Sequence, residues 1–255
     1  MDLADLRARF DERLRTAAFA DLDASANGLQ VGPEEGEITH VAFAVDAAVE
    51  TIERAADAGA DLLVTHHGLV WGGLDRVTDR EYRRIAPLLE DDLALYVSHL
   101  PLDAHPSLGN AAGLADLLGL DDREPFGALG PEHLGTQGLA RDPFSPADLA
   151  TLLDRELATG ARGVQTLDFG PGEIEEIAIL TGSGADWLDE AVESEADAFV
   201  TGEGKGKLYH EAKEAGIHVF LAGHYATETV GVHSLEDLAE EWSLETTFVE
   251  RPTGL

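Results

Sequence analysis

Short apolar runs alternate with amphipathic segments along this chain, a pattern typical of an α/β protein. The first segment, residues 2–15, carries apolar side chains at three- and four-residue spacing and predicts a helix. Residues 38–45 alternate enough to predict a strand, and residues 62–65 are an apolar run too short for a core helix, which we expect to be a buried strand. The segment between them, 47–58, has a helical pattern with Asp46 as its N-cap. Together the three elements predict a right-handed β-α-β unit.

The alternation continues to the end of the chain. Pro101 and Pro106 forbid a regular helix over residues 99–106, which we expect to form a shaped loop. Ser145 followed by Pro146 is a helix-start signal, an N-cap with proline at the first helical position. Further helices are expected at 79–90, 110–118, 146–158 and 235–242, further strands at 93–98, 218–222 and 244–249, and a glycine-bounded loop or short edge strand at 27–32.

The second half of the sequence repeats the first. Sliding the chain by 136 residues without a gap places Ile38 on Ile174, Val41 on Ile177, Ala60-Asp61 on Ala196-Asp197 and Val64-Thr65 on Val200-Thr201. So many matches at one offset, in strand-helix-strand order, indicate an internal duplication; a chance likeness of two Ala-rich helices is the alternative. We therefore expect two similar α/β lobes with layered α/β/α sheets, residues 1–124 and 125–255, joined by a junction rich in Pro and Gly at 121–145.

The chain is strongly acidic. It has 50 acidic against 17 basic residues and a formal net charge of −33, yet its hydrophobic fraction of 44% is ordinary for a globular protein. The excess acid must therefore lie on the surface. This balance is typical of a protein from a salt-loaded cytoplasm, where a Debye length of about 3 Å in molar salt screens self-repulsion. It argues against general nucleic-acid binding, which needs a cationic face.

The chain contains no cysteine, which removes disulfides, thiolate nucleophiles and cysteine-based zinc sites. Any metal must be held by histidine and carboxylate side chains. The first six residues are acidic and amphipathic, and no run of about 18 apolar residues occurs. We expect a soluble cytoplasmic protein that does not bind membranes.

Two adjacent histidines, His66 and His67, follow the predicted strand at 62–65. Ligands of open α/β sheets gather where parallel strands end, so these imidazoles are expected at the mouth of a crevice. Side chains of neighbouring residues diverge, and the pair therefore suits two metal ions better than one. Two solvated histidines in a surface turn are the alternative interpretation.

Two other strand ends carry a histidine with a carboxylate four residues later. These pairs are His99 with Asp103 and His224 with Glu228. If a helix opens at His224, that spacing places both side chains of the second pair on one helix face. The repeat adds Glu203, which aligns with His67.

Imidazole and carboxylate together suit hard or borderline divalent ions such as Zn, Mn, Fe or Ni. A central carboxylate can bridge two ions about 3.5–4 Å apart, the arrangement that activates water in dinuclear hydrolases. Coincident surface histidines and a single structural ion are the alternatives to a dinuclear site.

Five stretches, distributed from end to end, are specific in combination: Asn27-Gly-Leu-Gln-Val-Gly32, Thr65-His-His-Gly68, His99-Leu-Pro-Leu-Asp-Ala-His105, Ala196-Asp-Ala-Phe-Val-Thr-Gly-Glu203 and Gly223-His-Tyr-Ala-Thr-Glu228. With them the sequence resembles the NIF-three-like proteins, a family also labelled GTP cyclohydrolase I type 2 homologues. The resemblance implies two similar lobes with a dinuclear metal site between them, two divalent ions per chain, and a ring-like homohexamer. This chain lacks the additional domain that longer members insert between the lobes, in agreement with its short 121–145 junction.

The resemblance also implies roles for individual residues. Carried over by position, His67 and Asp103 hold one ion, His66 and His224 hold the other, and Glu228 bridges them. The cyclohydrolase label is a family name more than a demonstrated chemistry, so a substrate does not follow from it.

Two weaker signals point to an anionic substrate group. Gly182-Ser183-Gly184 follows a predicted strand, and its amides could cradle an anion, although a tight turn is the favoured interpretation. All three lysines lie between Lys205 and Lys213, where a solvated loop is favoured over an anion site. The sequence leaves the roles of Glu203, His105 and these lysines open, and it predicts no organic cofactor site.

Two functions are compatible with these observations. The first is a metal-dependent hydrolase that uses metal-activated water on a small phosphorylated or nucleotide-like molecule, with His99 as a proton shuttle or as a group that orients a ligand. The second is a non-enzymatic protein that stores, inserts or regulates metal ions. The sequence does not decide between them, nor does it identify the metal.

Overall fold

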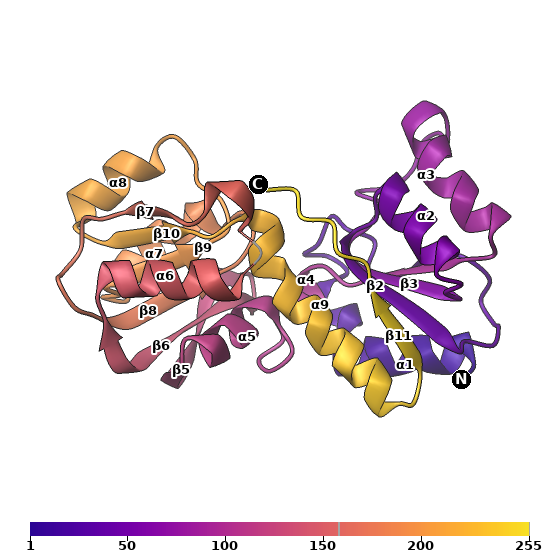
Figure 1. Ribbon diagram of the computed structural model, residues 1–255, viewed down its shortest axis with the longest axis horizontal. Coiled ribbons are helices and arrows are strands. Elements are labelled where there is room, and N and C mark those ends of the chain that lie inside the picture. Colours follow the sequence, from indigo (N-terminus) through magenta and orange to yellow (C-terminus); the bar gives the residue numbers. More distant parts are fainter. Residues whose placement is uncertain (158, 255) are drawn as a thin grey trace. The chain divides into compact units, whose positions relative to one another are not determined.

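The chain folds into two units, each built around its own β-sheet (Figure 1). The structure, a computed structural model, describes residues 1–157 and 159–254. The first unit comprises Met1–Leu102 with Val232–Arg251, and the second comprises Asp103–Gly231 with Pro252–Leu255. The C-terminal segment returns to the first unit, where its strand pairs with β2 (His40–Asp46).

The first unit has a five-stranded sheet in the order β1-β4-β3-β2-β11. The last four are parallel, and β1 is an antiparallel edge strand. The bounds are β1 Gly28–Val31, β2 His40–Asp46, β3 Leu62–His67, β4 Ala94–Val97 and β11 Glu245–Phe248. The first six residues of β2 are all buried, as expected of an apolar strand that is covered on both faces.

Helices cover both faces of the first sheet (Figure 1). Ile52 and Leu88 pack with Leu95 of β4 on one face. The next residue of β4, Tyr96, points to the opposite face. There its ring lies 5.3 Å from that of Phe10, which in turn lies 5.1 Å from the ring of Trp242. The helices are α1 Leu3–Arg13, α2 Val49–Asp57 and α3 Asp79–Glu90, with α4 Leu100–Asp103 as a single turn.

The second unit has a six-stranded sheet in the order β5-β6-β8-β9-β10-β7. Its strands β8, β9 and β10 are parallel, and the other pairings are antiparallel. The bounds are β5 Leu120–Leu129, β6 Glu132–Phe144, β7 Gln165–Leu167, β8 Ile174–Leu180, β9 Ala198–Thr201 and β10 His218–Leu221.

Helices cover both faces of the second sheet as well (Figure 1). Leu114 of α5 (Asn110–Leu117) and Leu153 of α6 (Pro146–Glu156) pack with Ile177 of β8 on one face. The other face carries α7 (Leu188–Glu193) and α8 (Leu208–Ala215), which contact each other and the sheet. The expected cap of α6 is confirmed, because the Ser145 hydroxyl accepts the Asp148 N–H. The expected fold class, two α/β/α-layered lobes, is therefore correct.

The segment 121–145 is a β-hairpin and not the loop-rich junction that its prolines and glycines predicted. Strands β5 and β6 pair across a turn at Gly130, whose φ is +59°. Pro125 is tolerated within β5 because this strand lies at the sheet edge, where a missing N–H breaks no inner ladder.

Two local expectations in the first unit were also wrong. Asp46 is the last residue of β2 and does not cap α2, which follows Ala48 without a side-chain cap. Residues 100–103 form one helical turn despite Pro101, because proline is accepted in the first turn, where its missing N–H has no helical partner.

The predicted duplication is visible in the backbone pairing. Val41 pairs with Leu62 in the first sheet, and Ile177 pairs with Ala198 in the second, which is the same register after the shift of 136 residues. In each copy one aspartate side chain accepts hydrogen bonds from two consecutive backbone N–H groups of the repeat. Asp61 Oδ2 accepts the N–H groups of residues 39 and 40, and Asp197 Oδ2 accepts those of residues 175 and 176. The second copy therefore reproduces the first down to single hydrogen bonds.

Aligned on their strands, the two histidine-carboxylate pairs are expected to be equivalent parts of the repeat, and the backbone pairing corrects this expectation. Thr65 pairs with Val97 and Thr201 with Leu221, so His99 corresponds to Gly223 and not to His224. The two histidine-carboxylate pairs are therefore offset by one residue. Both pairs lie where a helix follows a parallel strand, but the helix begins at Leu100 after His99 in the first pair and at His224 itself in the second.

Helix α9 (His224–Glu241) begins in the second unit and ends in the first. Its first residue is His224, which is the helix start that would place His224 and Glu228 on one helix face. None of the helices in the described part of the chain combines the length and apolar character needed to cross a bilayer.

Candidate metal-binding groups

Three histidines of the first unit lie together, and we call them the histidine group. His66 and His67 end β3, and their ring centroids are 4.6 Å apart. His99, which follows β4, has its ring 5.1 Å from that of His66 and 5.6 Å from that of His67. One nitrogen from each ring lies within 4.8 Å of the others, close enough for a common metal ion. Neighbouring carboxyl ends of parallel strands thus bring these residues together, as the sequence predicted.

Each ring of the histidine group is oriented through its Nδ1 atom. His66 Nδ1 lies 2.9 Å from the Ser98 carbonyl oxygen, and His67 Nδ1 lies 2.9 Å from Asp46 Oδ1. His99 Nδ1 lies 3.0 Å from Asp23 Oδ1. All three partners are acceptors, so each Nδ1 carries a proton, and in the neutral form of each ring Nε2 carries the lone pair. Metal-binding histidines characteristically donate their second ring nitrogen to a carbonyl or carboxylate in this way, and the donor set therefore fits a divalent ion.

Asp23 fixes His99 and its loop. Its side chain is 2% exposed, and Oδ2 also accepts the Leu100 N–H and the Asn27 side-chain amide. Burial alone raises the pKa of Asp23, but the hydrogen bonds from His99, Asn27 and Ser25 outweigh it and lower the pKa below its usual value. Asp23 therefore remains ionised and keeps His99 as a donor at Nδ1. Sequence reasoning missed Asp23, since it lies outside any strand end.

The second unit contributes a group rich in carboxylates, which we call the carboxylate group. His224 Nε2 lies 3.2 Å from Glu228 Oε1, and its Nδ1 lies 3.2 Å from Glu203 Oε1. Glu228 is 3% exposed, and one of its oxygens lies within 4.8 Å of an oxygen of Asp103. Glu203 also accepts a short hydrogen bond from the Ser183 hydroxyl. The group therefore comprises His224, Glu228, Glu203 and Asp103.

The carboxylates change the protonation of His224. Burial lowers the pKa of this imidazole, but the hydrogen bonds and charges of Glu228 and Glu203 outweigh that effect and raise the pKa to about 9. Hydrogen bonding from Ser183, followed by that from His224, lowers the pKa of Glu203 despite its partial burial. At neutral pH the carboxylate group therefore holds the positive charge of protonated His224 among carboxylate oxygens. A bound metal cation would take the place of this positive charge.

Asn110 orients Asp103. Its side-chain amide donates to Asp103 Oδ1 at 2.8 Å, and its own oxygen accepts the Gly231 N–H at 2.8 Å. Asn110 is fully buried, so the carboxylate of Asp103 is held by a rigid, satisfied amide. No sequence pattern marks this residue beyond its place at the start of a helix.

The anion-binding signals of the sequence have structural explanations. Lys205 forms an ion pair with Asp186, Lys207 lies 3.5 Å from Glu211, and the Lys213 ammonium lies 5.8 Å from the Phe169 ring centroid. The amides of Gly182 and Gly184 donate to the hydroxyls of Thr227 and Thr201. These contacts agree with the favoured interpretations, a solvated lysine loop and a tight glycine turn. His105 Nδ1 accepts two backbone N–H groups of its own loop.

Comparisons with known proteins agree with this fold. A family model described as Duf34/NIF3 (NGG1p interacting factor 3) matches residues 1–253. A Halobacterium salinarum protein called GTP cyclohydrolase 1 type 2 homolog is 57% identical over 255 residues, covering 100% of both chains. A Pyrococcus horikoshii protein of the same name is 40% identical over 256 residues, again covering 100% of both. The solved structure of TTHA1606 from Thermus thermophilus is 34% identical with a TM-score of 0.89, covering 100% of both chains.

Proposed function

Because the chain belongs to the Duf34/NIF3 family, we propose that it is a dinuclear metal-binding protein and a metal-dependent hydrolase of small phosphorylated or nucleotide-like molecules. One observation carries this proposal, namely the three imidazoles whose Nδ1 atoms are all tied to acceptors. Because acceptors hold a proton of each ring on Nδ1, the Nε2 atoms of His66 and His67 can bind divalent ions and that of His99 can accept a proton.

The two groups complement each other in charge. The histidine group supplies neutral nitrogen donors, whereas the carboxylate group supplies the negative oxygens that compensate two dications. We assign His67 and Asp103 to one ion, His66 and His224 to the other, and Glu228 to the bridge. The ions are Zn, Fe, Mn or Ni; when bound, they would lower the pKa of water and polarise the scissile group.

The chain's own residues would position and protonate the substrate. Asp23 holds the proton of His99 on Nδ1, so the Nε2 atom of His99 is the one that accepts or donates a proton. The same Asp-His arrangement orients general bases in hydrolases. We therefore assign His99 to proton transfer and Asp23 to its orientation.

Elemental analysis combined with an activity panel tests this function. Protein purified in molar salt is expected to contain about two divalent ions per chain and to hydrolyse a phosphoester or a cyclic amidine only when loaded. His99→Gln is expected to lower kcat by about 10²–10⁴-fold while metal content stays the same. Stable metal content without turnover of any substrate class would favour the alternative, a non-enzymatic metal-handling protein.

We also propose that the chain acts in the cytoplasm as a homo-oligomer, a hexameric ring, without nucleic-acid partners. Several large apolar side chains of the first unit support self-association, because they are 41% to 63% exposed on a very acidic protein. They are Trp71, Leu74, Val77, Tyr82 and Leu89. Light scattering in molar salt should give six chains for wild type and fewer for Leu89→Glu.

A further inference from the structure

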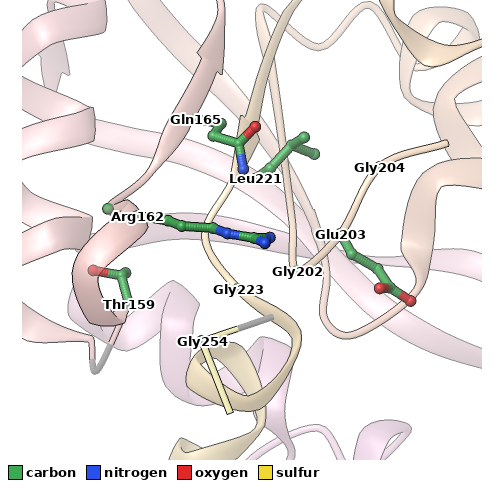
Figure 2. A pocket seen from close by; sticks show the side chains of 10 residues that line it. Thr159, Arg162, Gln165, Gly202, Glu203, Gly204, Leu221, Gly223 and Gly254 are labelled. Atoms are coloured by element: carbon green, nitrogen blue, oxygen red, sulfur yellow. The ribbon is translucent and has the colours of Figure 1, made fainter. Parts of the chain in front are cut away.

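A cavity of about 220 Å³ lies in the second unit at the carboxyl ends of β9 and β10 (Figure 2). Its lining includes Gly202 and Gly204 after β9, Gly223 after β10, and Arg162 with Gln165 from the segment that leads into β7. Five of the ten lining residues are glycines, so the walls expose main chain more than side chains. Ligands of α/β proteins gather at this end of parallel strands. The cavity borders the carboxylate group through Glu203.

Arg162 is the cation of this cavity. Figure 2 shows its side chain extending across the cavity toward Gly202, whereas the carboxylate of Glu203 points away from it. Within residues 1–157 and 159–254, no carboxylate forms an ion pair with Arg162. Other cations of the unit behave differently: Arg123 pairs with Asp116, Arg141 with Asp121, Arg155 with Glu156, and Lys205 with Asp186. Arg162 thus lines a cavity with a guanidinium that no carboxylate of the described residues neutralises, in a chain of formal charge −33.

The loop that carries Arg162 is held on both sides by Asp154. Asp154 Oδ1 accepts the Thr159 hydroxyl at 3.0 Å and the Val164 N–H at 2.7 Å. Between them Gly163 adopts a φ of +62°, and a Cβ added there would lie 3.1 Å from Asp154. The backbone under Arg162 is therefore fixed by an anchor that does not neutralise the guanidinium, which lowers the entropy cost of binding.

Glu203 does not supply the missing negative charge. Its carboxylate is engaged by the Ser183 hydroxyl and by His224 Nδ1. Apart from Glu203, whose carboxylate is engaged elsewhere, the cavity presents one planar cation, main-chain groups, the Gln165 amide and the side chains of Thr159 and Leu221. The cation and the hydrogen-bond donors suit an oxyanion better than a cation or an apolar group.

We propose that the Arg162 cavity binds the phosphoryl group of a small phosphorylated ligand, with Arg162 as its bidentate donor. The volume is below the roughly 300–1,000 Å³ of pockets that enclose a whole drug-sized ligand, so it suits one phosphoryl group with adjoining atoms. This inference rests on the proposed function, in which the remainder of the ligand reaches the metal-binding groups. Arg162 is then a substrate-binding residue, and the three lysines are not.

Equilibrium dialysis of radiolabelled inorganic phosphate against the full chain in molar KCl tests the proposal. The measurement is made before and after treatment with a chelator. Wild type is expected to bind one phosphate per chain at the cavity in both states, and Arg162→Gln is expected to weaken that affinity at least tenfold. Arg162→Lys should lose less, because the charge remains while the planar fork is removed. Arg155→Gln, an arginine on the neighbouring α6 that pairs with Glu156, is the matched control and should bind as wild type does.

Three outcomes would overturn the proposal. The first is an Arg162→Gln variant that binds phosphate as tightly as wild type. The second is a wild-type protein that binds no phosphate after chelation. The third is acetate, which offers only a carboxylate, being retained as well as phosphate. Complete loss after chelation would place the phosphate on the metal ions and leave the proposed function intact. Conversely, phosphate binding that depends on Arg162, in protein that contains no metal when purified from molar salt and binds none when divalent ions are added, would uphold the cavity and reject the dinuclear hydrolase.

Discussion

The Nε2 atom of His224 lies 3.2 Å from Oε1 of Glu228, one helical turn further along α9. Together with Glu203, this contact raises the pKa of His224 to about 9, from 6.5, against the opposing effect of burial. A proton is therefore bound more tightly by the folded chain than by the unfolded chain, and the stability of the metal-free protein must depend on pH.

The first prediction concerns that dependence. A raised pKa contributes stability that is fully present below about pH 6.5 and is lost as the pH rises through about 9. Urea unfolding of chelator-treated protein at constant salt should show the free energy of unfolding falling across this interval. His224→Gln should remove the decline, and an equal slope in that variant would contradict the assignment.

The second prediction separates the bridging carboxylate from its neighbour. Glu228→Gln removes the charge assigned to both ions and should lower occupancy at both positions together. Asp103→Asn should empty mainly one, because Asp103 is assigned to a single ion. Anomalous scattering at the metal edge gives the two occupancies, with Glu214→Gln and Asp189→Asn as exposed controls of the same chemistry. Single-ion losses in both variants would show that no bridge runs through Glu228.

A third prediction concerns the orientation of His67. Asp46→Ala removes the acceptor that holds its Nδ1 proton and should weaken metal affinity by about 10–100-fold. Asp46→Asn keeps an acceptor oxygen and should restore part of this loss. Asp57→Ala, an exposed aspartate of the same unit, controls for charge. Titration with a competing chelator measures all four proteins, and equal affinities for Asp46→Ala and Asp57→Ala would exclude a role for Asp46.

The repeated aspartates give a fourth prediction. Asp61 accepts two backbone N–H groups and the Thr39 hydroxyl, whereas Asp197 accepts two backbone N–H groups. Alanine at either position should cost about 1–3 kcal/mol of unfolding free energy, with the larger loss at Asp61. Burial raises the pKa of Asp61, but the hydrogen bonds that its carboxylate accepts outweigh burial and lower the pKa. The contribution of Asp61 to the free energy of unfolding is therefore present above about pH 3.8 and fades at lower pH. Urea unfolding measures the free energy of unfolding of both variants. Losses no larger than that of Asp57→Ala would contradict a structural role for the two aspartates.

A fifth prediction follows from the net charge of −33. Lowering the salt to where the Debye length is about 30 Å should expose self-repulsion among the surface carboxylates. A loss of about 3 kcal/mol would lower the Tm of a chain of this size by about 6–12 °C. Calorimetry from millimolar to molar KCl measures the shift. A flat Tm over that range would contradict an adaptation to salt.

Local periodicity in the sequence predicts part of this fold correctly. The range 79–90, expected to be a helix, is α3, and the Ser145 cap and the position of His66-His67 at a strand end are also correct. Prediction fails where tertiary contacts override local signals. Strand β5 contains Pro125 and can be recognised only from its pairing with β6 at the sheet edge.

The residues that orient the candidate ligands are the hardest to predict. Asp46 stands out in the sequence only as a helix cap, because its partner His67 is 21 residues away and becomes adjacent only through the β2–β3 pairing. Asp23 and Asn110 act on His99 and Asp103 from loops and helix starts without periodicity. Single-sequence patterns carry no information on such contacts.

The equal register of the two β-α-β units has a consequence for how this protein can diversify. The ladder between Val41 and Leu62, like that between Ile177 and Ala198, uses only main-chain groups, so it does not by itself dictate the side chains at the carboxyl ends of the strands. There one copy has His66-His67 and the other Gly202-Glu203. Exchange of these dipeptides is limited in the second copy, because a Cβ at Gly202 would lie 2.7 Å from the Gly182 carbonyl oxygen and 2.8 Å from His224 Cα. Duplication therefore allows the chemistry of a strand end to change in one copy, while the close packing around that strand end decides which side chains it accepts.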